Sequence, residues 1–417
     1  MSAIPVSPIL AALREAVSFE AVGEPAGNLT VGRGVLERRP LHVALAENRS
    51  ASGSLGARES EKLGALLRIV AAEKSALVLF LDSAGAKVSE GLGALGAFRA
   101  LYRAGLDAAF SGAPIAAVLG GNCYGGASML AHLAPRRLFS PETQLAMSGP
   151  SILAAAAGMS AIDDMFRAMA QASISPASRA KASGANTVWD RSMDLGAWLR
   201  EALVPRGDAA AASRTRHEAL QLRLGNAPQR PWERLRRRDL EKIYSSCDVK
   251  ESDGILAGSG ERNGEAEAVV GVVGKSPLGV ARAWKFSQIV WQHGDAPPAR
   301  LEVFLDCATH AGRLDDEKAV LSEFIVDMAF ALHVLAARGT RVGLTVLGKA
   351  GGGVYVALAA PARRVTAVHG ADIQVLPGSA VAAILGESKE SAPDFAEYRK
   401  AGVADEEVKL GIVPGMK

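Results

Sequence analysis

Two stretches of this 417-residue chain place a cluster of glycines directly after an apolar segment. In the first half, residues 114–119 run into residues 120–126 (GGNCYGG), and in the second half residues 342–347 run into 348–353 (GKAGGG). Glycine has no side chain, so the backbone N–H groups of such turns can approach a bound anion. Where the turn also begins a helix, its first amides have no partner inside the helix. The pattern indicates anion binding by main-chain amides.

A second apolar run precedes each of these clusters and ends in an acid, Asp82 in the first half and Asp306 in the second. The loop after Asp82, residues 83–91 (SAGAKVSEG), is rich in small residues that expose successive N–H groups. Two loops at neighbouring strand ends can aim two donors at one oxygen, which is the geometry of an oxyanion hole. The alternative is that the glycines serve only close packing of helix on strand, and the residues alone leave both interpretations open.

The two halves repeat each other at a long interval. Asp306 follows Asp82 by 224 residues, and Gly352 follows Gly125 by 227. The segment ERRP at 37–40 lies 224 residues before ERNG at 261–264, and we interpret both as hairpin turns. A period this long indicates two copies of a domain rather than a solenoid. The length of the chain suits two domains of about 200 residues each.

Apolar runs and helix-length stretches alternate in both halves. We predict strands at 31–36, 41–46, 76–82, 114–119, 138–140 and 144–147, with helices at 57–73 and 92–111. In the second half we predict strands at 269–273, 301–306, 342–347, 365–368 and 373–376, with a helix at 280–292. Such alternation is typical of parallel strands joined by right-handed crossovers. The expected fold class is α/β with two duplicated domains.

We divide the chain into a helical lead-in at 1–28, a first domain at 29–165, a helical bridge at 166–250 and a second domain at 251–417. The bridge is rich in arginine, with Arg214, Arg216, Arg223, Arg230, Arg234, Arg236, Arg237 and Arg238. One interpretation is a solvated helical linker. The other is an electrostatic docking site for an acidic carrier protein or a phosphate-bearing cofactor tail.

Bulk composition excludes several classes of protein. The net charge of +3 does not indicate nucleic-acid binding. Three scattered cysteines offer neither a disulfide framework nor metal-ligand spacing, and they favour a reducing, cytoplasmic location. The N-terminus lacks the pattern of a signal peptide. The longest weakly polar run, residues 152–162, is about half the ~20 residues of a membrane span, so we expect no membrane partner.

Read together, these segments resemble the carboxyltransferase branch of the ClpP/crotonase superfamily. Residues 82–91 resemble the SGGAR-x-x-EG loop of biotin-dependent acyl-CoA carboxylases, with Ala84 and Lys87 as departures. Residues 348–355 and 373–380 resemble two loops of the second carboxylase domain. Segments 31–34, 53–56 and 147–150 are similar to the beta subunit of biotin-independent malonate decarboxylase, and 348–350 to its gamma subunit. The resemblance implies tandem duplicated carboxyltransferase domains, with parallel sheets flanked by helices, in a fused beta/gamma chain.

The resemblance also implies two oxyanion holes. The first would use amides near Gly85, Ala86, Gly125 and Gly126, and the second amides near Thr309, His310, Gly352 and Gly353. Lys349, Tyr124, Tyr355 and Ser54 are candidates for substrate binding. In this family the N-terminal half of one unit faces the C-terminal half of another, which implies a homo-oligomer. We expect Gly126→Val to fold but to crowd the anion pocket.

The activity that the resemblance implies is decarboxylation of a malonyl thioester carried on CoA or on the phosphopantetheine arm of an acyl carrier protein. No covalently bound cofactor is expected. Departing CO₂ leaves an enolate, which hydrogen-bond donors at the thioester oxygen stabilise. Tyr124, His310 and Tyr355 are candidate proton donors. Carboxyl transfer to or from biotin, and a non-catalytic scaffold subunit that holds a carrier protein, stay open as alternatives.

The sequence departs from the family pattern at the second hole. The carboxylases carry Pro-Gly after the second strand, where this chain has Cys307-Ala308-Thr309-His310, and a pair of gamma-subunit arginines is replaced by residues 314–317 (LDDE). Simpler roles also compete: Lys349 as a solvated cap, His310 as a structural residue and Cys123 as a small buried thiol. Glu90 and Glu142 could form the acid/base pair of an enoyl-thioester hydratase, although their sequence context does not match one.

Overall fold

The computed structural model describes residues 7–159, 162–205, 207–225, 240, 242–376, 378, 381 and 393–409. They belong to two compact units, which we describe separately. The first unit takes residues up to 212 together with 312–323, and the second takes 213–311 and the residues from 324 onward. A segment of the second half of the sequence therefore packs within the first unit.

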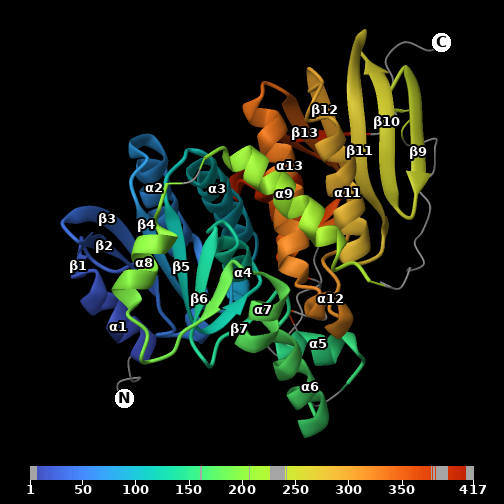
Figure 1. The fold of residues 1–417 in the computed structure, drawn as a ribbon. Helices are drawn as coiled ribbons and strands as arrows, with labels where there is room; N and C mark the ends of the chain where they lie inside the picture. Colours follow the sequence, from blue (N-terminus) through green and yellow to red (C-terminus); the bar gives the residue numbers. More distant parts are fainter. Residues whose placement is uncertain are drawn as a thin grey trace. The chain divides into compact units, whose positions relative to one another are not determined.

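The first unit alternates strands and helices along the chain (Figure 1). Its strands are β1 (Glu20–Ala21), β2 (Leu29–Leu36), β3 (Arg39–Ala46), β4 (Leu77–Ser83), β5 (Ile115–Tyr124), β6 (Arg136–Phe139), β7 (Gln144–Ala146) and β8 (Asn186–Val188). Its helices are α1 (Pro8–Ala16), α2 (Ala57–Glu73), α3 (Gly91–Phe110), α4 (Gly126–Ala131), α5 (Pro150–Ala156), α6 (Asp164–Ile174), α7 (Pro176–Ala182), α8 (Leu195–Ala202) and α12 (Leu314–Lys318), with short 3₁₀ turns η1 (Ala51–Gly53) and η2 (Val88–Glu90). The helix predicted at 57–73 is confirmed by α2.

The strands of the first unit form one eight-stranded sheet in the order β1-β2-β3-β4-β5-β6-β8, with β7 paired to the end of β5. The pairs β1–β2 and β2–β3 are antiparallel, and the remaining pairs are parallel. The parallel pairing predicted from the alternation of strands and helices is confirmed. Parallel strands bring their carboxyl ends to the same edge, so the loops after β4 and β5 meet there.

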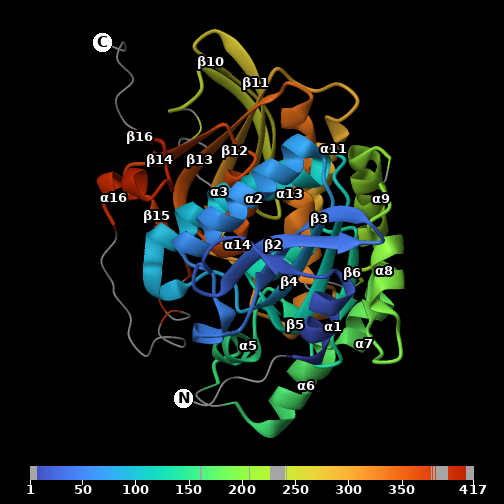
Figure 2. The same cartoon turned by 90° about the vertical axis from the view of Figure 1, so that its left-hand side faces the viewer.

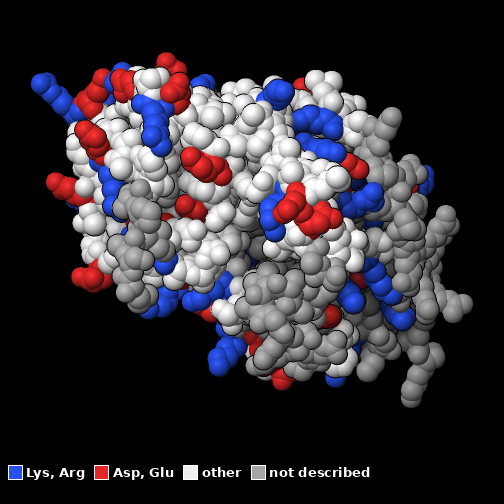
Figure 3. All heavy atoms as spheres, turned by 90° about the horizontal axis from the view of Figure 1, so that it is seen from below, with Lys and Arg blue, Asp and Glu red and all other residues white. Residues whose placement is uncertain are grey.

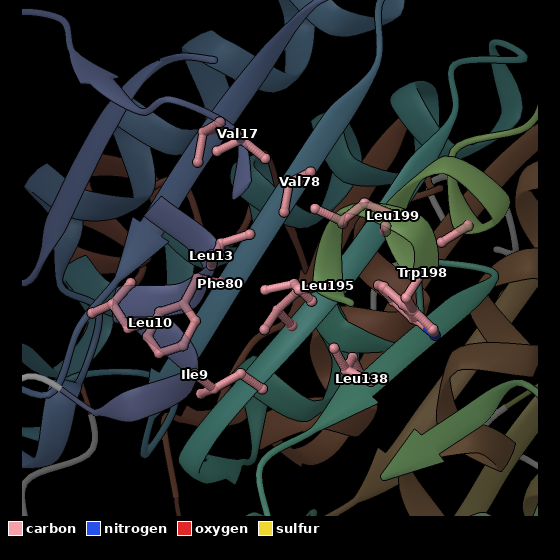
Figure 4. Close-up of a cluster of buried hydrophobic side chains, with 14 of the residues drawn as sticks. Ile9, Leu10, Leu13, Val17, Val78, Phe80, Leu138, Leu195, Trp198 and Leu199 are labelled. Carbon is pink, nitrogen blue, oxygen red and sulfur yellow. The ribbon is translucent and has the colours of Figure 1, made fainter. Parts of the chain in front are cut away.

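Helices α1 and α8 cover one face of the first sheet. In Figure 4 the side chains of α1, including Leu10 and Leu13, and of α8, including Leu199, point toward the strand residues Val78 and Phe80. These side chains belong to one cluster of buried apolar residues. Alternation along β4 turns its other residues, such as Leu79, to the opposite face. The lead-in helix thus belongs to the core of the first unit.

The second unit repeats this plan (Figure 2). Its strands are β9 (Ser246–Ser252), β10 (Ile255–Arg262), β11 (Glu265–Lys275), β12 (Arg300–Cys307), β13 (Arg341–Gly351), β14 (Arg364–Val368), β15 (Asp372–Gln374) and β16 (Glu406–Val408). Its helices are α9 (Ala209–Gln221), α11 (Val280–Gln292), α13 (Leu321–Ala337), α14 (Gly352–Ala359) and α16 (Phe395–Lys400); the first residues of α9 and α13 belong to the first unit. The helix predicted at 280–292 is confirmed by α11.

The second sheet has the same topology as the first. Its order is β9-β10-β11-β12-β13-β14-β16, with β15 paired to the end of β13. Again the first two pairs are antiparallel and the others parallel. Each strand of the first sheet therefore has a counterpart at the same place in the second, as the predicted duplication requires.

The hairpin turns correspond differently from the prediction. The two-residue turn of the first hairpin is Glu37–Arg38, between the paired Leu36 and Arg39, and that of the second is Asn263–Gly264, between Arg262 and Glu265. All four turn residues have positive φ, between 49° and 76°, which matches a tight hairpin turn. Since residues 37 and 263 differ by 226, the proposed alignment of 37–40 with 261–264 is wrong by two residues.

The predicted bridge at 166–250 is divided between the units. Helices α6, α7 and α8 lie in the first unit, whereas the chain from residue 213 onward lies in the second. Arg230, Arg234 and Arg236–238 of the bridge lie outside the described residues, as do Pro377, Ser379 and Ala380 of a predicted loop motif. Of the eight arginines named for the bridge, Arg214, Arg216 and Arg223 are described and are considered below.

Candidate active site

Two loops meet at the carboxyl edge of the first sheet. The loop after β4 contains Gly85, with φ of +92°, and the turn after β5 contains Gly125, with φ of +51°. A Cβ atom added at Gly85 would lie 2.7 Å from the carbonyl oxygen of Tyr124 and 2.9 Å from the amide nitrogen of Gly126. The predicted residues Gly85, Gly125 and Gly126 therefore come together, and glycine is required at Gly85 because of both its φ and this close approach.

Two backbone amides at this point are available to a ligand. The Leu55 N–H donates to the Gly85 carbonyl (2.8 Å) and the Lys87 N–H donates to the Leu55 carbonyl (2.9 Å), so Ala86 N takes no part in this bridge. Gly126 N belongs to the first turn of α4 and has no partner within that helix. Within the described residues, neither amide donates to a protein acceptor. Ala86 and Gly126 therefore offer two N–H donors at adjoining loops.

The acids predicted at the strand ends anchor the glycine strands. An Asp82 carboxylate oxygen accepts the Asn122 N–H at 2.9 Å, and an Asp306 carboxylate oxygen accepts the Lys349 N–H at the same distance. A Cβ atom at Gly120 would lie 2.6 Å from the Cβ of Asp82, and one at Gly348 would lie 2.5 Å from a carboxylate oxygen of Asp306. Glycine at 120 and 348 makes room for these aspartates, which fix the path of each strand into its turn.

The second unit forms the equivalent pair of loops. The Leu278 N–H donates to the Thr309 carbonyl (2.9 Å) and the Ala311 N–H donates to the Leu278 carbonyl (2.8 Å), the same bridge that Leu55 forms in the first unit. Thr309 therefore takes the place of Gly85, and His310 that of Ala86. Gly352 has φ of +54°, close to the value at Gly125, and a Cβ atom there would lie 3.2 Å from Thr309 Oγ1. The predicted residues Thr309, His310 and Gly352, with Gly353 next in the chain, also converge.

The first loop is where the two sites differ. Gly85 has a positive φ, whereas Thr309 is absent from the positive-φ residues of the described chain. The backbone that precedes the first N–H donor therefore has a different conformation in the two loops. This difference agrees with the replacement of glycine by Thr309 in the second loop. In addition, the buried His310 side chain places its Nδ1 3.3 Å from Thr309 Oγ1, which gives the second site a polar side-chain pair.

The remaining predicted side chains have different environments. Lys349 is exposed, and Ser54 is buried, with its carbonyl accepting from the Asn28 side chain at 2.9 Å. The Tyr124 hydroxyl donates to the Gln144 side chain. Burial raises the pKa of Tyr124 well above its ordinary value, and the nearby carboxylates of Glu317 and Asp82 act in the same direction, so the phenol stays protonated.

Two expectations need correction. Tyr355 is fully buried and its hydroxyl donates to the carbonyl of Val403, so its side chain is committed to packing rather than to substrate binding or proton donation. A Cβ atom at Gly126 would lie 2.4 Å from the buried Phe98 ring. The Gly126→Val substitution would therefore disturb packing beneath α4 instead of crowding an anion at the amide nitrogen.

Sequence reasoning missed Glu317, which lies in α12 but within the first unit. Its fully buried carboxylate accepts the N–H groups of Met147 (3.3 Å) and Ser148 (2.9 Å). Burial raises the pKa of Glu317 to about 7, with Arg179 and the two N–H groups opposing the rise. Residues 314–318 resemble an ordinary solvated helix start, and no local pattern indicates a partner about 170 residues away.

Cys123, Glu90 and Glu142 have structural roles. Cys123 is fully buried, and burial raises the pKa of its thiol, so it stays protonated. Glu90 accepts the Ala57 N–H at the start of α2 and pairs with Lys87 at 3.0 Å, and these donors lower the pKa of Glu90. Glu142 accepts a hydrogen bond from Ser140.

The described bridge arginines engage their own unit. Arg214 pairs with Asp295 at 3.0 Å, Arg216 lies 5.3 Å from the Phe330 ring centroid, and Arg223 lies 5.7 Å from that of Phe324. Figure 3 shows basic and acidic side chains interspersed over one face, with no block of a single sign in the part that is coloured. Arg214 thus forms a surface ion pair, whereas Arg216 and Arg223 lie against aromatic rings.

The described part of the chain contains neither a cluster of metal-binding side chains nor a helix that could span a membrane. Among the described residues, no three His, Cys, Asp or Glu side chains gather in a way that could bind a metal ion. None of the helices in the described ranges combines the length and the apolar composition needed to cross a bilayer.

Comparison with known proteins relates the chain to carboxyl-handling enzymes. No family model matches it. A stretch of 135 residues is 28% identical to the methylmalonyl-CoA carboxyltransferase 12S subunit of Propionibacterium freudenreichii subsp. shermanii. This match covers 32% of the chain and 25% of the subunit, so it spans about a quarter of that relative's length.

Solved structures cover more of the chain at lower identity. A transcarboxylase 12S hexamer structure with methylmalonyl-coenzyme A and methylmalonic acid bound is 18% identical, with a TM-score of 0.37, and the match covers 96% of this chain and 86% of that one. A Pseudomonas malonate decarboxylase hetero-tetramer in complex with malonate is 22% identical, with a TM-score of 0.45, covering 53% and 91%. The beta subunit of P. aeruginosa geranyl-CoA carboxylase is 15% identical, with a TM-score of 0.35, covering 92% and 77%. The chain thus has two similar α/β domains, each with a mostly parallel eight-stranded sheet flanked by helices.

Proposed function

We propose that the chain is an enzyme that cleaves the carbon–carbon bond to the free carboxylate of a malonyl-type thioester. The substrate is carried on CoA or on the phosphopantetheine arm of an acyl carrier protein. The observation that supports this most strongly is the close approach of Gly85 to Gly126 N, because the amides of Gly126 and of Ala86, which follows Gly85, have no protein acceptor among the described residues.

The two amides suit the charge that decarboxylation creates. When the bond to the carboxylate breaks, CO₂ leaves and the electron pair stays on the acyl group as an enolate, with negative charge on the thioester oxygen. Preorganised N–H donors at that oxygen each contribute roughly 3–4 kcal/mol of transition-state stabilisation. A proton then adds to the α-carbon and gives the acetyl thioester. No protein nucleophile is needed, in keeping with the protonated, buried Cys123.

The proposal assigns the second site to the substrate carboxylate. Thr309, His310 and Gly352 lie together in the second unit, and the exposed Lys349 side chain is close in sequence and can attract an anion. Because the hydroxyls of Tyr124 and Tyr355 donate to protein acceptors, we assign the final proton to water or His310. We also propose a homo-oligomer in which the first unit of one copy faces the second unit of another.

Carboxyl transfer to or from biotin is a second candidate. The observation that favours it is the 28% identity over 135 residues with a methylmalonyl-CoA carboxyltransferase subunit. The two reactions share the enolate and the donors at Ala86 and Gly126, and they differ in whether CO₂ is released or captured by a carrier nitrogen.

The test removes one donor and leaves the fold in place. Ala86→Pro deletes an N–H that has no acceptor in the described protein, and Ala86→Gly keeps it and serves as the matched control. We expect kcat for CO₂ release from malonyl-CoA or malonyl-carrier to fall about 100- to 1,000-fold in Ala86→Pro, and to change less than about threefold in Ala86→Gly. Equal activity in the two variants would remove this amide from the mechanism.

A second assay separates the candidate reactions. The wild-type chain is incubated with malonyl-CoA and with malonyl-carrier, with and without free biotin or a biotinylated carrier protein, and products are followed by mass spectrometry. Acetyl thioester formation that does not respond to biotin supports decarboxylation. Carboxybiotin formation supports transfer. Binding of carrier protein without any turnover would leave the scaffold role as the better account.

A further inference from the structure

The glycine turn of the first site rests on the short strand β7. The Tyr124 and Ala146 positions pair at the end of β5, and the Gly125 N–H donates to the Ala146 carbonyl at 3.0 Å. The Ser128 hydroxyl donates to the Gly125 carbonyl at 2.7 Å. The peptide that leads into Gly126 N therefore takes its orientation from β7 and from the first turn of α4.

The end of β7 is held by an acid from the second half of the sequence. The Glu317 carboxylate accepts the N–H groups of Met147 and Ser148, which directly follow Ala146. A carboxylate that accepts two backbone N–H groups forms charge-assisted hydrogen bonds, which are shorter and stronger than neutral ones. Because Glu317 has no exposed side-chain surface, water cannot replace these bonds.

A buried arginine completes the arrangement. The Arg179 side chain, from α7, donates from Nε to the Leu145 carbonyl (2.9 Å) and from Nη1 to the Glu317 carbonyl (2.6 Å), and its Nη2 lies 3.7 Å from the Glu317 carboxylate. Neither side chain is exposed. Residues 145–148 are thus held from both sides by an ion pair whose two charges offset each other's burial.

We propose that Glu317 is a positioning residue for the first anion site. It fixes Met147 and Ser148, and through Ala146 it sets the orientation of the Gly125 peptide that precedes the Gly126 donor. This inference rests on the proposed function for its catalytic consequence, but its structural content concerns the mobility of the turn alone. Glu317 does not contact substrate in this account, since its carboxylate is fully buried.

Four variants test the inference. Glu317→Gln keeps one oxygen acceptor and loses the charge, Glu317→Ala loses both acceptors, and Glu317→Asp keeps the charge but shifts it by one methylene. The matched control is Glu323→Gln, which removes a buried acid from the same segment. Glu323 lies 3.6 Å from Arg137 and 3.9 Å from His132, both of which are separate from β7.

The first readout is amide hydrogen exchange, which needs no substrate. At equal global stability, set with urea, we expect exchange at Gly125, Met147 and Ser148 to be at least about tenfold faster in Glu317→Gln and faster still in Glu317→Ala. Glu323→Gln should leave these amides within about twofold of wild type. The exchange rates in Glu317→Asp should be intermediate. Because this variant keeps the charge, it still tests the inference if the variants that lose the charge do not fold.

The second readout is the kinetics of CO₂ release from malonyl-CoA. We expect kcat to fall about tenfold in Glu317→Gln with KM within about twofold, because the donor is misplaced in the transition state rather than removed from substrate binding. Partial recovery is expected in Glu317→Asp, and kcat within about twofold of wild type in Glu323→Gln. The same exchange rates and kcat in Glu317→Gln and Glu323→Gln would overturn the inference. If the wild-type chain releases no CO₂, the proposed function fails, and the exchange data alone then support or overturn the role of Glu317.

Discussion

The two sheets share one topology but differ in the chemistry of one face. In the first sheet, this face carries apolar side chains that pack beneath α1 and α8 (Figure 4). Five of them lie on successive strands: Leu36, Leu41, Val78, Val118 and Leu138. At the matching register positions the second sheet carries Arg262, Glu267, Glu302, Thr345 and Thr366.

The polar face of the second sheet is organised by hydrogen bonds. Arg262 donates to Glu267 and to Glu302, both at 3.1 Å, and the Thr345 hydroxyl donates to Glu302 at 2.6 Å. A smaller apolar cluster that includes Tyr244 packs beside these groups. The two sheets thus keep the same strand order and turn chemistry, while a whole core face changes from apolar packing to paired charges. Paired buried charges usually contribute less to stability than apolar packing does.

The largest loss in the free energy of unfolding is expected when an acid is placed on the apolar face of the first sheet. Val78→Glu copies the residue of the second sheet into the first, where Val78 is fully buried and has no arginine partner in its apolar cluster. An unpaired buried carboxylate should reduce the free energy of unfolding by at least about 4 kcal/mol. Urea unfolding followed by circular dichroism measures this. A loss below 1 kcal/mol would mean that the two faces are interchangeable.

A smaller loss is expected from a cavity on the same face. Leu199→Ala removes a fully buried side chain of α8 and should reduce the free energy of unfolding by about 2–5 kcal/mol. Leu222→Ala is the control, since the Leu222 side chain is 88% exposed and its loss should cost less than about 0.5 kcal/mol. Similar losses in both variants would show that α8 does not seal the first core.

The polar face should make stability depend on pH. Burial raises the pKa of Glu302 above its ordinary value of 4.5, against the opposing effects of Thr345 and Arg262. The folded state then binds this proton more tightly than the unfolded state. The contribution of Glu302 to the free energy of unfolding is therefore greatest below about pH 4.5, and it decreases as the pH rises through the raised pKa.

Comparison with Glu302→Gln checks the sign. The stability of wild type relative to this variant should decrease as pH rises from about 4, measured by urea unfolding at a series of pH values. Val78→Gln, at the matching position of the first sheet, should show no such trend from its own site. A wild-type advantage that grows with pH would contradict the assignment.

The smallest change in stability is expected from a substitution of Lys349, an exposed side chain at a strand end. Lys349 stands where the first unit has Asn122, and the N–H of each donates to an aspartate. Lys349→Asn should change the free energy of unfolding by less than about 0.5 kcal/mol. We expect KM for a malonyl thioester to rise about threefold at low salt with little change in kcat, because a solvated charge acts mainly on encounter. An unchanged KM would leave Lys349 as a solvated cap.

Features set by local sequence were predictable. The duplication, the strands that end in Asp82 and Asp306, and the glycine turns all depend on apolar runs and on residues with special backbone freedom. The convergence of Gly85 with Gly126 follows from parallel strand order, which the alternation of strands and helices already indicates.

Features set by tertiary partners were not predictable. Gly126 lies against the Phe98 ring, the Tyr355 hydroxyl donates to the Val403 carbonyl, and the Glu317 side chain is buried against Arg179. Each of these contacts is made with a segment that is distant in sequence. The Asn263-Gly264 pair predicts the turn of the second hairpin correctly, but the alignment of the two hairpins was wrong by two residues because Glu261-Arg262 looks like Glu37-Arg38 in composition.

The placement of residues 312–323 in the first unit has a consequence for how the polypeptide can be divided. A fragment that ends near residue 212 would keep the buried Arg137 and Arg179 but lose the carboxylates of Glu323 and Glu317 that lie opposite them. Both buried arginines would then lack their acidic partner, so this fragment should be less stable than the first unit of the full chain and should gain stability when residues 312–323 are supplied. Folding of the first unit thus depends on a short segment encoded in the second half of the sequence.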